Sequence, residues 1–61
     1  MSADQRRLLR QLEGRMRQCL AITDIRRQLT QTGMTADDIW AFERTVRRQI
    51  RAERAGRRAA A

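Results

Sequence analysis

The sequence contains no histidine, and its only cysteine is Cys19. Histidine is the usual general base and the commonest metal ligand, so the chain lacks the first candidate for either role. A single cysteine excludes an internal disulfide and any CxxC-type metal site, and it fits a reducing cytoplasm. Gly-rich phosphate loops, serine nucleophile motifs and paired carboxylates are absent as well. The sequence therefore predicts a protein that is not an enzyme and that takes no cofactor, metal or small-molecule substrate.

Proline is absent too, and the chain shows neither an internal repeat nor a linker. No apolar run approaches the roughly 20 residues of a membrane span or the core of a signal peptide. A core formed by 61 residues rarely supplies more than about 3–5 kcal/mol of stability. We therefore expect residues 1–61 to form a single small helical domain in the cytoplasm, without membrane contact, that associates with a partner or forms a homodimer.

Negative charge is also scarce. The chain has seven acidic residues against fourteen arginines and no lysine, which gives a net charge of +7. Positive charge of this density favours polyanions such as nucleic acid, an anionic membrane surface or an acidic protein. The planar guanidinium group suits phosphate and carboxylate better than an ammonium group does. The composition thus indicates a binding protein with an acidic partner.

The apolar spacing predicts an all-α fold, a small bundle of three helices over about 3–19, 23–32 and 36–55. Ser2 followed by Gln5 matches a capping box, which would start the first helix. Its apolar stripe is predicted to run along the residues Leu8, Leu9, Leu12, Met16 and Cys19 or Leu20.

The turn between the second and third helices has the clearest sequence signals. Gly33 can take the left-handed conformation that ends a helix, and Met34 follows where a Schellman motif places an apolar residue. Thr35 is a favourable N-cap for the next helix. Gly56 is predicted to end that helix, which leaves Arg57 to Ala61 as a frayed basic tail.

The third helix separates apolar and basic residues onto different faces. Steps of three and four residues connect the apolar set, which consists of Ile39, Phe42, Val46 and Ile50. The same steps connect a second set, for which we predict binding to nucleic acid or an acidic partner, and which continues into the tail: Arg44, Arg47, Arg48, Arg51, Arg54, Arg57 and Arg58. Only Glu43 and Glu53 offset this charge, which favours an external anion over a solvated surface.

Two single residues allow a structural and a functional interpretation. Trp40, the only tryptophan, falls among the arginines, where it is either a partner anchor or a cover for the edge of the core. Cys19 is most simply a small buried apolar residue.

Part of the chain also matches a known pattern of residues. The first portion of the match consists of Arg15, Arg17, Cys19, Ile22 and Ile25. After a turn about two residues shorter, the second portion consists of Met34, Thr35, Ile39, Phe42, Val46 and Ile50. On these residues, the segment 15–53 resembles the Hha/YmoA family of small bacterial nucleoid-associated modulators. It departs from that family at Arg47, where the family has an aspartate, and it lacks the family's C-terminal aromatic segment.

The resemblance implies a transcription modulator of the nucleoid that acts through an H-NS-type partner, together with non-specific contacts to the DNA backbone. The segment 28–46 also resembles the oligomerising helical part of H-NS proteins. Two other functions stay open from the residues themselves. One is a helix-turn-helix regulator that contacts DNA directly through the third helix. The other is a phage- or plasmid-encoded inhibitor that covers an acidic surface of a host protein.

Overall fold

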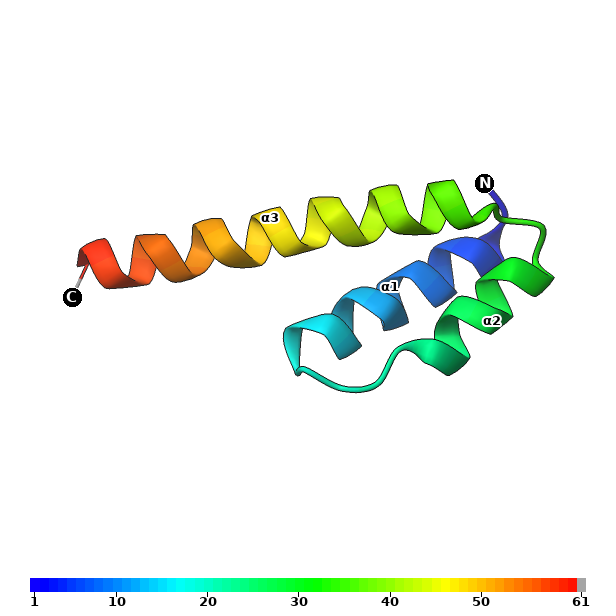
Figure 1. Cartoon of the computed structure of the whole chain (residues 1–61), viewed down its shortest axis with the longest axis horizontal. Coiled ribbons are helices and arrows are strands. Elements are labelled where there is room, and N and C mark those ends of the chain that lie inside the picture. Colours follow the sequence, from blue (N-terminus) through cyan, green and yellow to red (C-terminus); the bar gives the residue numbers. More distant parts are fainter. Residues whose placement is uncertain (61) are drawn as a thin grey trace.

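The chain folds into three helices, α1 (Ala3–Arg17), α2 (Thr23–Gln31) and α3 (Ala36–Ala60) (Figure 1). This computed structural model describes the backbone of residues 1–60 and the side chains of residues 1–57. Successive helices run in opposite directions, so that α1 and α3 point the same way (Figure 1). The predicted all-α fold of three helices is confirmed. The second and third helices begin at the predicted residues, Thr23 and Ala36.

The predicted caps are present at the starts of α1 and α3. The backbone N–H of Gln5 donates to the Ser2 hydroxyl at 3.1 Å, and the Ser2 N–H donates to Oε1 of Gln5 at 2.9 Å. The N–H of Asp38 donates to the Thr35 hydroxyl at 3.2 Å. These bonds satisfy amide groups that a helix start would otherwise leave without a partner.

Gly33 ends α2 in a complete Schellman motif, as predicted. Its φ is +91°, and its N–H donates to the carbonyl of Thr30 at 3.0 Å. The N–H of Met34 donates to the carbonyl of Leu29 at 3.3 Å, and its side chain packs against the core. The side-chain amide of Gln5 donates to the Thr32 carbonyl at 3.1 Å, which joins the start of α1 to this turn. The turn thereby sets the direction in which α3 leaves the other two helices.

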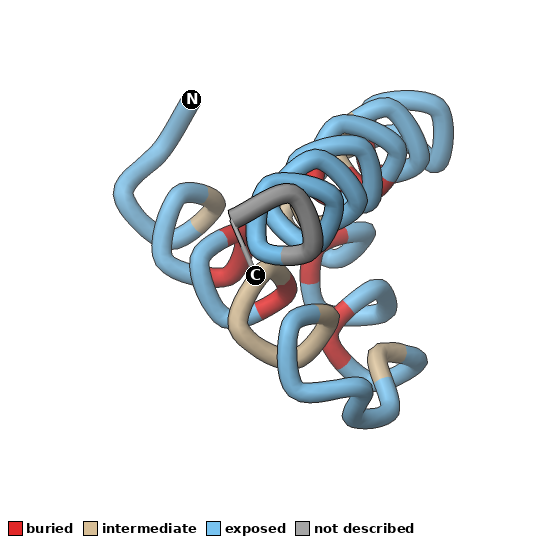
Figure 2. Tube along the Cα trace, turned by 90° about the vertical axis from the view of Figure 1, so that its left-hand side faces the viewer, coloured by how far each residue is buried: buried red, intermediate tan, exposed pale blue. Residues whose placement is uncertain are grey.

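The core lies along the line where the three helices meet (Figure 2). Side chains from all three helices are buried in it: Leu8, Leu9, Leu12, Ile25, Leu29 and Ile39. Val46 is buried further along α3, and Ile50 is only partly buried. Burying a Leu or Ile side chain contributes about 1.5–3 kcal/mol. The buried apolar residues near the start of α3, Ile39 and Val46, therefore hold this helix in place.

The end of α1 differs from the prediction. The helix ends at Arg17, and Cys19 follows in the left-handed conformation with φ of +59°. The N–H of Cys19 donates to the Met16 carbonyl at 3.2 Å, and the N–H of Leu20 donates to the Arg15 carbonyl at 2.8 Å. This is a second Schellman motif with cysteine where glycine is usual. Cys19 and Leu20 are exposed, so the expectation that they extend the buried stripe is wrong.

The end of α3 is the second correction. The helix passes through Gly56 and continues to Ala60, so neither the stop at Gly56 nor the frayed tail is observed over residues 57–60. Glycine in an exposed helix is only about 1 kcal/mol less favourable than alanine, and no proline follows it. As a result, α3 projects well past the ends of α1 and α2 (Figure 1). Over the described residues, no helix combines the length and apolar character needed to cross a membrane.

Candidate nucleic-acid interface

The buried carboxylate of Glu43 on α3 accepts hydrogen bonds from two arginines. Glu43 is only 1% exposed, and Nε of Arg26 on α2 donates to its Oε2 at 2.7 Å while Nη2 of Arg26 donates to Oε1. Arg47, one turn further along α3, donates to Oε1 at 3.1 Å. The hydrogen bonds from Arg26 lower the pKa of Glu43 against the opposing effect of burial. One acid thus engages two arginines, and Arg47 is not free to move out to an external anion without leaving Glu43.

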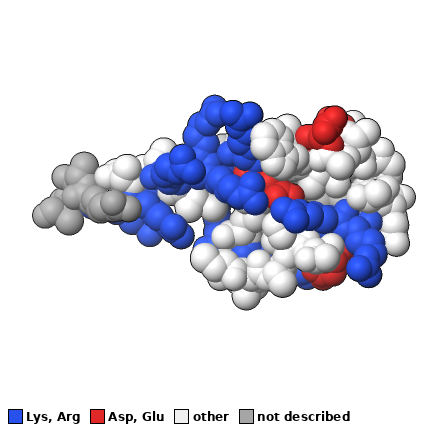
Figure 3. Space-filling view, in the orientation of Figure 1, with Lys and Arg blue, Asp and Glu red and all other residues white. Residues whose placement is uncertain are grey.

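Five further arginines of α3 are exposed and lack a carboxylate partner in the described part of the chain. Within the described residues, no carboxylate forms an ion pair with Arg44, Arg48, Arg51, Arg54 or Arg57. All of them are exposed. Basic side chains gather over the middle of α3 and onto its projecting part (Figure 3). We call the five residues Arg44, Arg48, Arg51, Arg54 and Arg57 the arginine row.

Trp40 lies at the start of the arginine row. Trp40 is 56% exposed, so more than half of its surface is open to solvent. The guanidinium carbon of Arg44 stands 5.3 Å from the centroid of the indole ring, within the range of a cation–π contact. Trp40 and the residues Arg44, Arg47, Arg48 and Arg51 line a hollow of about 420 Å³. We call it the basic hollow.

Trp40 also lines a second hollow, of about 490 Å³, between α2 and α3. It is lined by Arg26, Thr30, Ala36, Asp37, Ile39, Trp40 and Glu43. We call it the interhelix hollow. Here Arg26 and Glu43 neutralise each other, so its lining carries far less positive charge than the basic hollow. Trp40 therefore lines both a cationic space and a mixed polar and apolar one.

The projecting part of α3 is connected to the body of the protein by one ion pair. Arg17, in the last turn of α1, donates to Oε2 of Glu53, and it also donates to Oε2 of Glu13 at 3.0 Å. These hydrogen bonds raise the pKa of Arg17. Because Glu53 is engaged with α1, it does not neutralise the arginine row.

The two ends of α3 carry opposite charge. Asp37 and Asp38 lie in its first turn, where the helix dipole favours negative charge. Neither forms an ion pair within the described residues. The arginine row begins one to two turns later and continues along the projecting part. An anion thus meets repulsion at the start of α3 and attraction along the rest of it.

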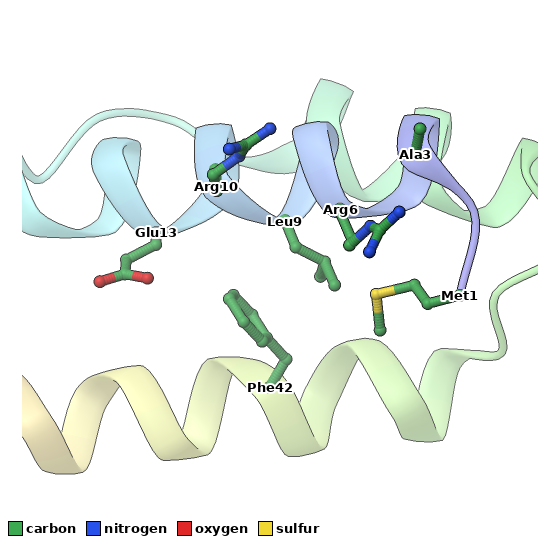
Figure 4. Close-up of a pocket in the computed structure, with 7 residues that line it drawn as sticks. All are labelled: Met1, Ala3, Arg6, Leu9, Arg10, Glu13 and Phe42. Carbon is green, nitrogen blue, oxygen red and sulfur yellow. The ribbon is translucent and has the colours of Figure 1, made fainter.

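An apolar groove of about 580 Å³ runs between α1 and α3, apart from the arginine row. Leu9 and Phe42 point toward one another from the two helices, and the side chain of Met1 enters the same space (Figure 4). Arg6, Arg10 and Glu13 also line the groove. Phe42 therefore stays only partly buried, and the bundle keeps an apolar opening that a second protein could contact.

The structure places the predicted site residues as follows. It brings Trp40 together with Arg44, Arg47, Arg48 and Arg51, and it extends the row through Arg54 and Arg57. Arg58 is on the helix, but its side chain lies outside the described residues. Sequence reasoning missed Arg17 and Arg26, which engage Glu53 and Glu43, the two glutamates of α3. Their partners are 36 and 17 residues away, so helical spacing holds no signal for them.

No protein-family model, curated protein or solved structure matches the chain. In the described part of the chain, no group of acidic and cysteine side chains is arranged to hold a metal ion.

Proposed function

We propose that this protein binds the nucleic-acid backbone without sequence preference, through the arginine row of α3, and acts as a small nucleoid-associated modulator of transcription. One observation carries the proposal: five exposed arginines without an acidic partner in the described structure follow one another along α3, and several of them lie on a part of it that projects from the body. A projecting helix can reach into a groove or lie along a backbone without obstruction by the rest of the protein. Its guanidinium groups suit phosphate oxygens.

The charge order along α3 favours backbone contacts over base reading. In a helix-turn-helix protein the first residues of the recognition helix approach the base edges. Here those residues include Asp37 and Asp38, which phosphates repel. Direct reading of bases by the start of α3 is therefore the weaker candidate, although the four-residue connection between α2 and α3 has a suitable length.

The role as a modulator adds a protein partner to this proposal. The resemblance of residues 15–53 to the Hha/YmoA family suggests an H-NS-type protein. The apolar groove between α1 and α3 offers such a partner a surface that leaves the arginine row free for DNA. In this arrangement the protein adds positive charge to a complex that is already on the DNA.

The test is a titration of labelled duplex DNA, followed by fluorescence anisotropy over a series of salt concentrations. Two variants with the same net charge are compared. One replaces Arg48, Arg51 and Arg54 of the row with Gln, and the other replaces Arg6, Arg10 and Arg27, which lie outside it. We expect the row variant to lose about 0.9 in the log–log salt slope for each phosphate contact removed, and the control to stay near the original protein.

Each other outcome is informative. Equal losses in both variants would mean that net charge alone attracts the DNA, and the arginine row would not be the contact surface. Discrimination between a chosen and a scrambled duplex would favour a helix-turn-helix regulator. Binding that appears or strengthens when a purified H-NS-type protein is added supports the modulator role. Absence of binding under all these conditions would leave an acidic host protein as the partner.

A further inference from the structure

We propose that Trp40 is a stacking platform for an unpaired base, so that the protein prefers single-stranded nucleic acid to a duplex. This inference rests on the proposed function, because it assigns the polyanion a class. The arginine row alone accounts for attraction to phosphate, but it does not account for an exposed indole at its head.

The indole ring of Trp40 is largely exposed to solvent. Trp40 is 56% exposed and is not one of the buried residues that form the core. The flat face of an indole is a favourable surface for a nucleobase, and stacking on aromatic side chains recurs in proteins that bind single strands. In a duplex, both faces of each internal base are already covered by its neighbours, so Trp40 has nothing to stack on.

The two hollows that Trp40 lines differ in charge. The basic hollow offers Arg48 and Arg51 to the phosphates of a strand, while Arg44 stands over one face of the indole ring. The interhelix hollow has no excess of positive charge, because Asp37 and Glu43 outnumber Arg26 in its lining, and it includes the apolar wall of Ile39 and Ala36. A nucleotide has the same division, with an anionic phosphate and a flat uncharged base. The site can therefore hold the phosphates in the basic hollow while a base lies against Trp40.

Polar groups around the interhelix hollow can form hydrogen bonds with a base. The carboxylate of Asp37 can accept a hydrogen bond from an amino or imino group of a base. The Thr30 hydroxyl on α2 donates to the Arg26 carbonyl at 3.0 Å, and its oxygen can still accept a hydrogen bond. Asp37 has no ion-pair partner among the described residues, so it is available to such a donor. A carboxylate beside an arginine-rich surface is poorly placed for a phosphate, but it is well placed for a base.

Trp40 itself reports on the test, because it is the only tryptophan and the chain contains no tyrosine. Its fluorescence is followed while the protein is titrated with three probes of about 15 units, within the site sizes known for single-strand binding. The probes are oligothymidylate, a duplex, and an abasic strand that keeps the phosphates but lacks the bases. We expect oligothymidylate to quench the fluorescence and the other two to leave it nearly unchanged.

The matched variants are Trp40→Leu and Trp40→Phe, with helix content checked by circular dichroism. We expect Trp40→Leu to weaken binding of oligothymidylate about tenfold, Trp40→Phe to weaken it less, and neither to change the affinity for the abasic strand. Equal affinity for oligothymidylate and the abasic strand, or no effect of Trp40→Leu, would overturn the inference while the backbone-binding function stands. Binding of oligothymidylate without binding of the duplex would support the inference and overturn the function on duplex DNA.

Discussion

Arg26 on α2 donates two hydrogen bonds to the carboxylate of Glu43 on α3, and that carboxylate is almost completely buried. The guanidinium group of Arg26 stays partly exposed, so water still reaches one partner of the pair. Such a pair is costly to break from the buried side, because a carboxylate without a partner loses its hydration and gains nothing in return. It fixes the position of α3 relative to α2 just beneath the arginine row.

Removal of the charge at Glu43 should destabilise the fold. We expect Glu43→Gln to lower the free energy of unfolding at neutral pH by about 1.5–3 kcal/mol, the range for hydrogen bonds to charged groups. Urea denaturation followed by circular dichroism measures the change. The control is Glu53→Gln, which removes an exposed pair worth about 0–1 kcal/mol. Equal losses in the two variants would contradict the structural role of Glu43.

Acid should remove the same contribution from the original protein. The pKa of Glu43 is lower in the folded state than its value of about 4.3 in an unfolded chain. Its stabilisation is therefore complete above the unfolded pKa and is lost as pH falls through the folded pKa. Asp24, whose pKa is lowered by Arg15, acts in the same direction. Unfolding free energies measured from neutral pH into this acid range should fall less steeply in Glu43→Gln than in the original protein.

The turn after α1 offers a stabilising substitution. Cys19 holds the left-handed conformation, which costs a residue with a Cβ atom about 1–2 kcal/mol. We expect Cys19→Gly to raise the free energy of unfolding by up to about 1 kcal/mol, because glycine adopts this φ without strain but loses more entropy on folding. Cys19→Val is the opposite control and should destabilise the protein. A destabilised Cys19→Gly variant would mean that the cysteine side chain makes a contribution that its exposed position does not account for.

Gly56 gives a test of the length of α3. The helix continues through Gly56, and a Cβ atom added there meets nothing within 4 Å. We expect Gly56→Ala to increase the helix population of the following residues, since alanine is about 1 kcal/mol more favourable in a helix. Cα chemical shifts of residues 57–60 measure this population. If the helix ended at Gly56 instead, the substitution would leave these shifts unchanged or move them away from helical values.

Some local signals in the sequence were sufficient, whereas the one at Gly56 predicted a helix end that the structure does not have. Gly33 followed by Met34 and Thr35 predicted a turn that the structure confirms in its hydrogen bonds. The separation of Ile39 and Val46 from the arginines also predicted correctly which face of α3 is buried. Each of these features depends on residues within one or two turns of each other.

Other features depended on contacts or conformations that local patterns do not encode. The turn at Cys19 has no glycine to mark it, so apolar spacing carried the first helix too far. Glu43 resembled any other acid on the charged side of a helix. Its burial is compensated by hydrogen bonds from Arg26, which lies on another helix and 17 residues away in the sequence. The candidate site shows the same limit in part, because the interhelix hollow exists only once α2 and α3 are packed together, whereas the residues that line the basic hollow all belong to α3.

The opposite charges at the two ends of α3 have a consequence for the rate of binding. Asp37 and Asp38 lie at one end, and unpaired arginines continue to Arg57 on the projecting part. The electric field of a polyanion exerts a torque on such a distribution and turns the projecting end toward itself during approach. More encounters then begin in a productive orientation, and the association rate rises. Because the Debye length is about 8 Å at physiological ionic strength, added salt should weaken this steering and slow association in addition to loosening the complex.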